Sequence, residues 1–147
     1  MHDRIKSVHL DLEVTGVEQL LRQQVQSLHN GGHLSQVDEP LRLLMEREAV
    51  HSTAMGGGVA FPHARWDGCL EPMVVVSRLR DRISFGGAGT VPVDLVFLIL
   101  GPEGDPSRHV SILGRLAKLV QNQETMVKLR KATDEVSFLN HLRNGLF

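Results

Sequence analysis

The chain has 147 residues, of which 41% are hydrophobic and 22% are charged. This composition indicates one globular domain over residues 1–147 with a buried core, and it excludes a disordered or collagen-like chain. The 16 Lys and Arg side chains nearly balance the 17 Asp and Glu side chains, for a formal net charge of −1, so the overall charge gives no reason to expect nucleic-acid binding.

The cysteine content and the apolar stretches indicate in which cellular compartment the protein is expected. The single cysteine, Cys69, cannot form an internal disulfide, and the first residues lack the apolar core of a signal peptide. The most apolar stretch, from Val91 to Leu100, is too short for a membrane-spanning helix and contains Pro92 and Asp94. We therefore expect a cytoplasmic protein without membrane insertion.

A strand and two helices are predicted in the first third of the chain. Apolar and polar residues alternate over residues 7–12, the period of a strand with one buried face. Thr15 and Glu18 have the form of a capping box, and the helical apolar spacing after them ends at Gly31-Gly32. A second amphipathic helix is predicted over about residues 35–48.

Three apolar runs in the middle of the chain, at residues 59–63, 73–79 and 93–100, predict strands. The last two runs are almost continuously apolar, which is typical of a sheet that is covered on both faces. The segment Gly86-Gly87-Ala88-Gly89 is expected to form a loop between them.

Three helices are predicted at the end of the chain, over residues 105–120, 123–131 and 134–143. Asp105 followed by Pro106 is a typical N-cap and first-turn pair. The order of elements is therefore βαα-βββ-ααα. It predicts the α/β class, as a three-layer α/β/α sandwich with a mixed central sheet.

One histidine follows a glycine-rich turn, a short apolar run and a proline within residues 56–63. Pro62 has a fixed φ and keeps Phe61 extended, so we expect His63 at the end of a strand in a rigid orientation. An unperturbed imidazole has a pKa of about 6.5 and offers a neutral nitrogen lone pair at cellular pH. His63 is therefore a candidate nucleophile or phosphate carrier.

Donors for an anion lie close to His63 in the sequence. Glycine amides can form an anion-binding nest, hydroxyls can reach phosphate oxygens, and a guanidinium offers a planar fork. The candidates are Arg47, Ser52, Thr53, Gly57 and Gly58. Each has a structural alternative: Arg47 can pair with Glu48 or Asp38, and Ser and Thr commonly cap turns.

A second histidine, His109, is predicted in the first helical turn after Asp105, where free amides and the helix dipole favour an anion. The alternative is a solvated surface residue. His29 and His33 have a spacing seen in metal sites, but the glycines between them interrupt the helix. No metal site is expected.

The order of these parts resembles the fructose/mannitol class of phosphotransferase-system (PTS) enzyme IIA, with the spacing of its nitrogen-regulatory subgroup. The resemblance covers about Leu10 to Leu142. The parts are Arg47-Glu48 at a helix end, Ser52-Thr53, a glycine turn, Pro62-His63, and His109 opening the helix after the last long strand.

The resemblance implies a protein-histidine phosphotransferase component. In that family the histidine after proline receives a phosphoryl group from a small phosphohistidine carrier (HPr-like) and passes it on, which gives this role to His63. It implies that His109 orients His63 or donates to the phosphate. It also implies that no metal or other cofactor is needed.

Two roles within the family stay open, transfer to an enzyme IIB of sugar transport or binding of regulatory targets, and the spacing favours regulation. A non-catalytic interaction module of the same fold is a third possibility. Ala64 replaces the usual glycine after Pro-His and is followed by Arg65 and Trp66. Trp66 is either a core residue or an exposed anchor for a partner.

Overall fold

The computed structural model describes residues 4–85 and 91–146; the predicted glycine loop at 86–89 lies outside these ranges. Within them, no helix is long and apolar enough to cross a membrane. The elements in chain order are β1 (Ile5–Leu12), α1 (Val17–Asn30), α2 (Asp38–Val50), β2 (Ala54–Gly56), β3 (Val59–Ala60), β4 (His63–Trp66), β5 (Met73–Phe85), β6 (Val91–Pro102), α3 (Pro106–Val120), α4 (Gln123–Lys131) and α5 (Glu135–Gly145).

The strands form one mixed six-stranded sheet in the order β1-β5-β6-β3-β2, with β4 also paired to β6. β5 and β6 are antiparallel neighbours, with Val75 opposite Leu98. β1 runs parallel to β5, whereas β3 and β4 run parallel to β6. β2 closes the sheet as the antiparallel partner of β3.

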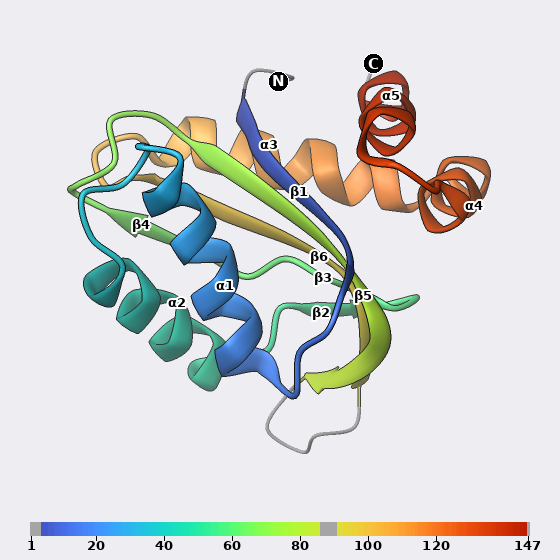
Figure 1. Cartoon of the computed structure of the whole chain (residues 1–147). Helices are drawn as coiled ribbons and strands as arrows, with labels where there is room; N and C mark the ends of the chain where they lie inside the picture. Colours follow the sequence, from blue (N-terminus) through green and yellow to red (C-terminus); the bar gives the residue numbers. More distant parts are fainter. Residues whose placement is uncertain (1–3, 86–90, 147) are drawn as a thin grey trace.

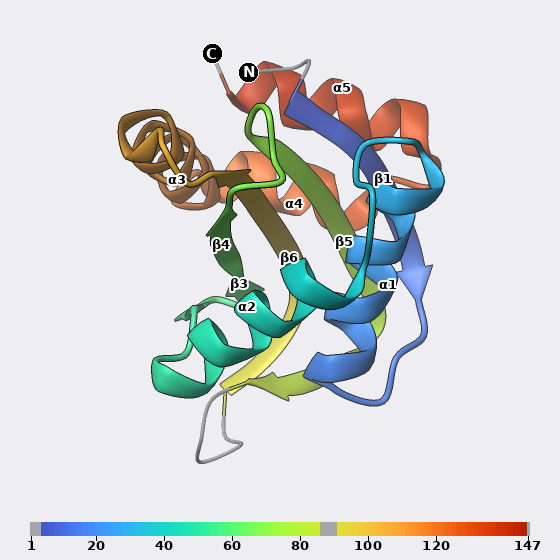
Figure 2. The same cartoon turned by 90° about the vertical axis from the view of Figure 1, so that its left-hand side faces the viewer.

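Alternate residues of the central strands fill two separate cores. Val74 and Val76 of β5 pack with apolar residues of α3, α4 and α5. Met73 and Val75 pack on the opposite face with α1 and α2. Figures 1 and 2 show the same division, with the sheet between the two groups of helices. The predicted three-layer α/β/α sandwich is confirmed.

The predicted strand over residues 59–63 is divided in two. Pro62 has no N–H for a strand ladder, and the N–H of Phe61 donates to the carbonyl of Thr53 (3.2 Å). The chain therefore leaves β3 at Ala60 and resumes as β4 at His63. His63 begins a strand rather than ending one, so the sequence-based expectation was wrong in this detail.

One predicted helix cap is wrong and another is confirmed. Gly16 is the N-cap of α1 and no side chain caps this end, whereas Thr15 donates from its N–H to Oε1 of Gln19 (2.7 Å). At α3, Oδ1 of Asp105 accepts from the N–H of Arg108 (3.3 Å), as expected from the sequence.

A buried arginine joins the sheet to α4. Nη1 of Arg78 on β5 donates to the carbonyls of Leu129 (2.9 Å), Arg130 (3.3 Å) and Ala132 (2.7 Å), and Arg78 is 8% exposed. These carbonyls lie at the C-terminal end of α4, where backbone carbonyls have no N–H donor within the helix. The guanidinium therefore fixes α4 against the sheet.

Replacement of this arginine tests the contact. Arg78→Met leaves the carbonyls at the end of α4 without a donor, and we expect a loss of about 3 kcal/mol in the free energy of unfolding. Urea denaturation measures the change. Arg80→Met, at an exposed position paired with Glu13, is the matched control and should leave stability nearly unchanged. Equal effects of the two substitutions would contradict the assignment.

Candidate active site

His63 is held in one orientation by the backbone that precedes it. Its Nδ1 lies 2.8 Å from the carbonyl oxygen of Phe61. Because a carbonyl can only accept, Nδ1 carries a proton, and in the neutral ring the lone pair is on Nε2. The carbonyl of Pro62 is itself fixed, since it accepts from the N–H of Ile99 on β6 (2.9 Å).

The second predicted histidine lies beside the first. The ring centroids of His63 and His109 are 5.4 Å apart, with an angle of 54° between the ring planes. His109 is in the first turn of α3 and is buried, with 5% of its surface exposed. The fold thus brings together two imidazoles that are far apart in the sequence, as the resemblance implied.

The buried nitrogen of His109 indicates its tautomer. Among the residues that the structure describes, Nδ1 of His109 has no hydrogen-bond partner. A buried N–H without an acceptor is rarer than an under-satisfied acceptor, so we place the proton on Nε2. A Cβ at position 101 would lie only 3.1 Å from this Nδ1, so the absence of a side chain at Gly101 gives the His109 ring the space it occupies.

The environment keeps His109 uncharged. Burial lowers the pKa of His109 to about 4, with smaller contributions from the nearby His63 and Arg65. At neutral pH the ring is therefore a neutral donor through Nε2.

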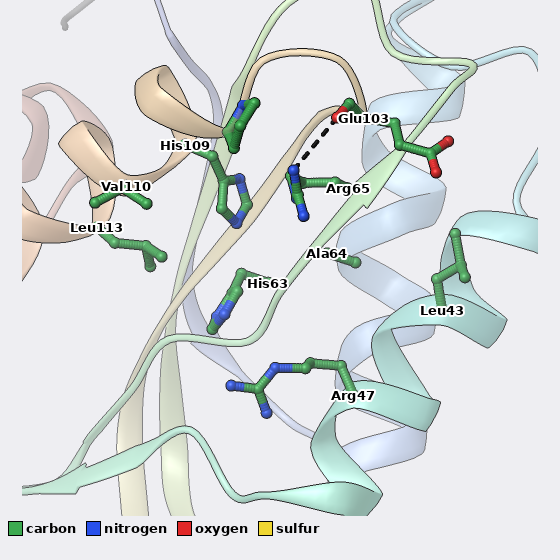
Figure 3. Close-up of a pocket in the computed structure, with 10 residues that line it drawn as sticks. Leu43, Arg47, His63, Ala64, Arg65, Glu103, His109, Val110 and Leu113 are labelled. Carbon is green, nitrogen blue, oxygen red and sulfur yellow. Dashed lines mark hydrogen bonds between the residues drawn. The ribbon is translucent and has the colours of Figure 1, made fainter.

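The two histidines line a hollow of about 480 Å³. Figure 3 shows His63 between His109 of α3 and the Arg47 side chain of α2. Arg65 of β4 also lines the hollow, so two guanidiniums face the same space. Its apolar lining includes Leu43, Val110 and Leu113.

Hydrogen bonds connect Arg47, in the last turn of α2, with the loop that follows this helix. Nη1 of Arg47 donates to the carbonyl of His51 (3.0 Å). Glu48 instead accepts from the N–H (2.8 Å) and the hydroxyl (2.6 Å) of Thr53. The sequence left open a pairing of Arg47 with Glu48, but Glu48 is occupied by Thr53, which leaves Arg47 beside His63.

The two hydroxyl residues differ in what they can donate. Thr53 is buried and its hydroxyl proton is directed to Glu48. The Ser52 hydroxyl accepts from the N–H of Ala54 (3.2 Å), so its own proton stays available. Both residues line a second hollow of about 490 Å³ that adjoins His63. Phosphate binding by Ser52 and Thr53 stays a prediction, and the Thr53 hydroxyl is engaged with Glu48.

The glycine turn lies away from both hollows at His63. Gly56, Gly57 and Gly58 have φ values of 82°, 64° and 82°, which favour glycine, and they join β2 to β3. The carbonyl of Gly57 accepts from Nη2 of Arg130 (2.6 Å). Neither hollow beside His63 is lined by Gly57 or Gly58, so the predicted anion nest is not placed at this histidine.

From the sequence, Arg65 was noted only as a residue that follows Ala64, and it was not counted among the site residues. The predicted strand ended at His63, whereas in the structure β4 runs from His63 to Trp66, so positions 63 and 65 share a face. The same alternation buries Trp66, which is 8% exposed and packs in the core with α1 and α2. The open question about Trp66 is thereby answered, because it is a core residue.

No cluster of three or more His, Cys, Asp or Glu side chains suited to a metal ion occurs in the described ranges. The chemistry available at the site is that of a neutral imidazole nucleophile, a neutral imidazole donor and two guanidiniums. This set is suited to a tetrahedral anion carried on nitrogen.

Comparison with known proteins places the chain in a family. The model of the "Phosphoenolpyruvate-dependent sugar phosphotransferase system, EIIA 2" family matches residues 4–145. The chain belongs to this family. A nitrogen regulatory protein of Bradyrhizobium diazoefficiens is 39% identical over 92 residues, which cover 63% of this chain and 60% of that relative's length.

Solved structures of PTS proteins share the fold. Nitrogen regulatory protein IIA-Ntr from Neisseria meningitidis matches with a TM-score of 0.84 at 24% identity, over 99% of this chain and 98% of that chain. Enzyme IIAMTL from Escherichia coli, solved in complex with phosphorylated enzyme IIBMTL, matches with a TM-score of 0.79 at 20% identity, over 93% and 94%. The resemblance inferred from the sequence is confirmed at the level of family and fold.

The lowered pKa of His109 predicts a pH-dependent stability. The unfolded chain takes up this proton near pH 6.5 and the folded protein only near pH 4, so the contribution is complete above pH 6.5 and is lost as the pH falls towards 4. We expect wild type to lose about 3 kcal/mol more than His109→Gln between pH 7 and pH 4. Urea unfolding at both pH values measures this. Parallel pH profiles of the two proteins would contradict it.

Proposed function

We propose that the protein is a phosphoryl carrier of the PTS that accepts a phosphoryl group on Nε2 of His63. The observation that carries this proposal is the 2.8 Å contact between Nδ1 of His63 and the Phe61 carbonyl. In the neutral ring it leaves the lone pair on Nε2, and the hollow is also lined by His109 and Arg47. Positioning and charge stabilisation are the main demands of phosphoryl transfer.

The transfer step balances without an added acid or base. The lone pair on Nε2 of His63 attacks phosphorus on the phosphohistidine of a small carrier protein (HPr-like). A new N–P bond forms and the N–P bond of the donor breaks. The carrier imidazole, which is protonated on its other ring nitrogen, takes that electron pair and leaves as neutral imidazole. Nδ1–H of His63 keeps its bond to the Phe61 carbonyl throughout, so no proton has to move between the two proteins.

The neighbouring side chains stabilise the transferred group. Nε2–H of His109 donates to a phosphoryl oxygen, and Arg47 provides a charged donor from α2. A neutral His109 suits this role because it always has its proton on the side of the hollow. Ser52, through its free hydroxyl proton, is the further donor that the site offers.

Membership of the PTS EIIA family supports the proposed partners. The phosphoryl donor is a phosphohistidine carrier, and the transfer takes place in the cytoplasm. The 39% identity to a nitrogen regulatory protein favours regulation of target proteins as the role of the phosphorylated chain. Onward transfer to an enzyme IIB is the second candidate, supported by the shared fold with the IIAMTL of the IIAMTL–IIBMTL complex.

The direct test is phosphorylation by a purified phosphohistidine carrier. We expect wild type to gain the mass of one phosphoryl group in an acid-labile linkage, and His63→Gln to gain none, because the accepting nitrogen is removed. His109→Gln and Arg47→Gln should keep the acceptor and react about 10²-fold more slowly. Intact-mass spectrometry over time measures all four proteins.

The possible outcomes separate the alternatives. A wild-type protein that stays unmodified would favour a non-catalytic interaction module. Modification of His63→Gln to the same extent as wild type would place the acceptor elsewhere. Efficient sugar phosphorylation after addition of an enzyme IIB and its permease would replace the regulatory role by the transport role.

A further inference from the structure

Arg65 stands beside His63 because of the two-residue period of β4. Side chains alternate along a strand, so residues 63 and 65 project from the same face with their Cα atoms about 7 Å apart. The intervening Ala64 and the following Trp66 are buried in the core with α1 and α2. His63 and Arg65 therefore face the opposite side, towards α3, and both line the hollow.

A hydrogen bond fixes the exposed guanidinium at the edge of the hollow. Nη1 of Arg65 donates to the carbonyl oxygen of Glu103 (3.3 Å) in the turn that leads into α3. Figure 3 shows the guanidinium beside the His109 ring, with the carboxylate of Glu103 directed away. Because the acceptor is a neutral carbonyl, this bond holds the guanidinium without cancelling its charge.

The charge of Arg65 acts inside the hollow. It is one of the causes that lower the pKa of His109, after burial and His63. Arg47 approaches the same hollow from α2, on the other side of His63 from His109 (Figure 3). The hollow thus receives positive charge from two different elements of the fold.

We infer that Arg65 is the second cation of the hollow and that, with Arg47, it stabilises the phosphoryl group held on His63. This inference rests on the proposed function and adds a residue to it. The phosphoryl oxygens carry negative charge, and a guanidinium already held at the edge of the hollow can donate to them. Arg65 therefore increases the share of phosphoryl group that stays on His63 at equilibrium with its carrier.

An exchange equilibrium tests the inference. Wild type and Arg65→Gln are incubated with the phosphorylated carrier protein, and the phosphorylated fractions of both partners are measured by ³¹P NMR. We expect the equilibrium constant for transfer to His63 to fall about tenfold in Arg65→Gln, the usual effect of losing one charged hydrogen bond. Arg65→Lys keeps the charge but not the fork, and should recover part of the loss.

A matched control removes the same charge elsewhere. Arg80 lies near the end of β5 away from the hollow, where it pairs with Glu13. Arg80→Gln should leave the equilibrium constant unchanged. An equal loss in Arg80→Gln and Arg65→Gln would show that only net charge matters, and it would overturn the specific role of Arg65.

A second readout needs no phosphoryl donor. Because Arg65 lowers the pKa of His109, Arg65→Gln should raise that pKa above its value of about 4, whereas Arg80→Gln should not. ¹⁵N NMR titration of the imidazole measures it. An unchanged titration would mean that the charge of Arg65 does not reach the hollow, and it would overturn the inference.

The failures of the two proposals are distinguishable. A wild-type protein that takes no phosphoryl group overturns the proposed function and this inference with it. A phosphorylated wild type whose equilibrium constant equals that of Arg65→Gln overturns only the inference.

Discussion

The hydrogen bond from Nδ1 of His63 to the carbonyl of Phe61 is the contact on which the site depends. Without it, the imidazole could rotate and exchange tautomers, and neither nitrogen would be reserved for phosphorus. Two features of the backbone hold the carbonyl in place: Pro62 restricts Phe61 to extended conformations, and the Pro62 carbonyl is bound by β6. The break between β3 and β4 is therefore the structural basis of the nucleophile.

The rest of the fold brings charge and a donor to that nucleophile. The sheet carries His63 and Arg65 on one strand, α2 contributes Arg47, and the first turn of α3 contributes His109. The contributions come from the sheet and from one helix in each of the two helical layers, so the hollow exists only when both layers are docked on the sheet. The bond between Thr53 and Glu48 orders the loop after α2 and leaves Arg47 free to face the site.

Periodic patterns made most of the fold predictable, and local backbone chemistry explains the differences. The almost continuous apolarity of the runs that form β5 and β6 correctly indicated a sheet covered on both faces. The helix from Gln123 to Lys131 was also correctly bounded. The division of residues 59–63 was missed because a short apolar run does not reveal that Pro62 and the Phe61 N–H leave the ladder.

The candidate site was predictable only in part, because several of its contacts depend on the local path of the backbone. Motif order identified His63 and His109, but it could not show that the turn at Gly57 lies beside Arg130 rather than at the hollow. Nor could it show that Glu48 uses the Thr53 hydroxyl, because that contact depends on how the chain leaves α2. Arg65 was missed because the predicted strand ended at His63, and its hydrogen bond to the Glu103 carbonyl depends on the turn before α3.

The identity of the reactive nitrogen is the most direct measurement of the central claim. Long-range ¹H–¹⁵N NMR of the histidine ring distinguishes a protonated, an unprotonated and a phosphorylated nitrogen. We predict a proton on Nδ1 of His63 in the free protein and phosphorus on Nε2 after reaction with the carrier. A free protein with its proton on Nε2, or a product with phosphorus on Nδ1, would contradict the account.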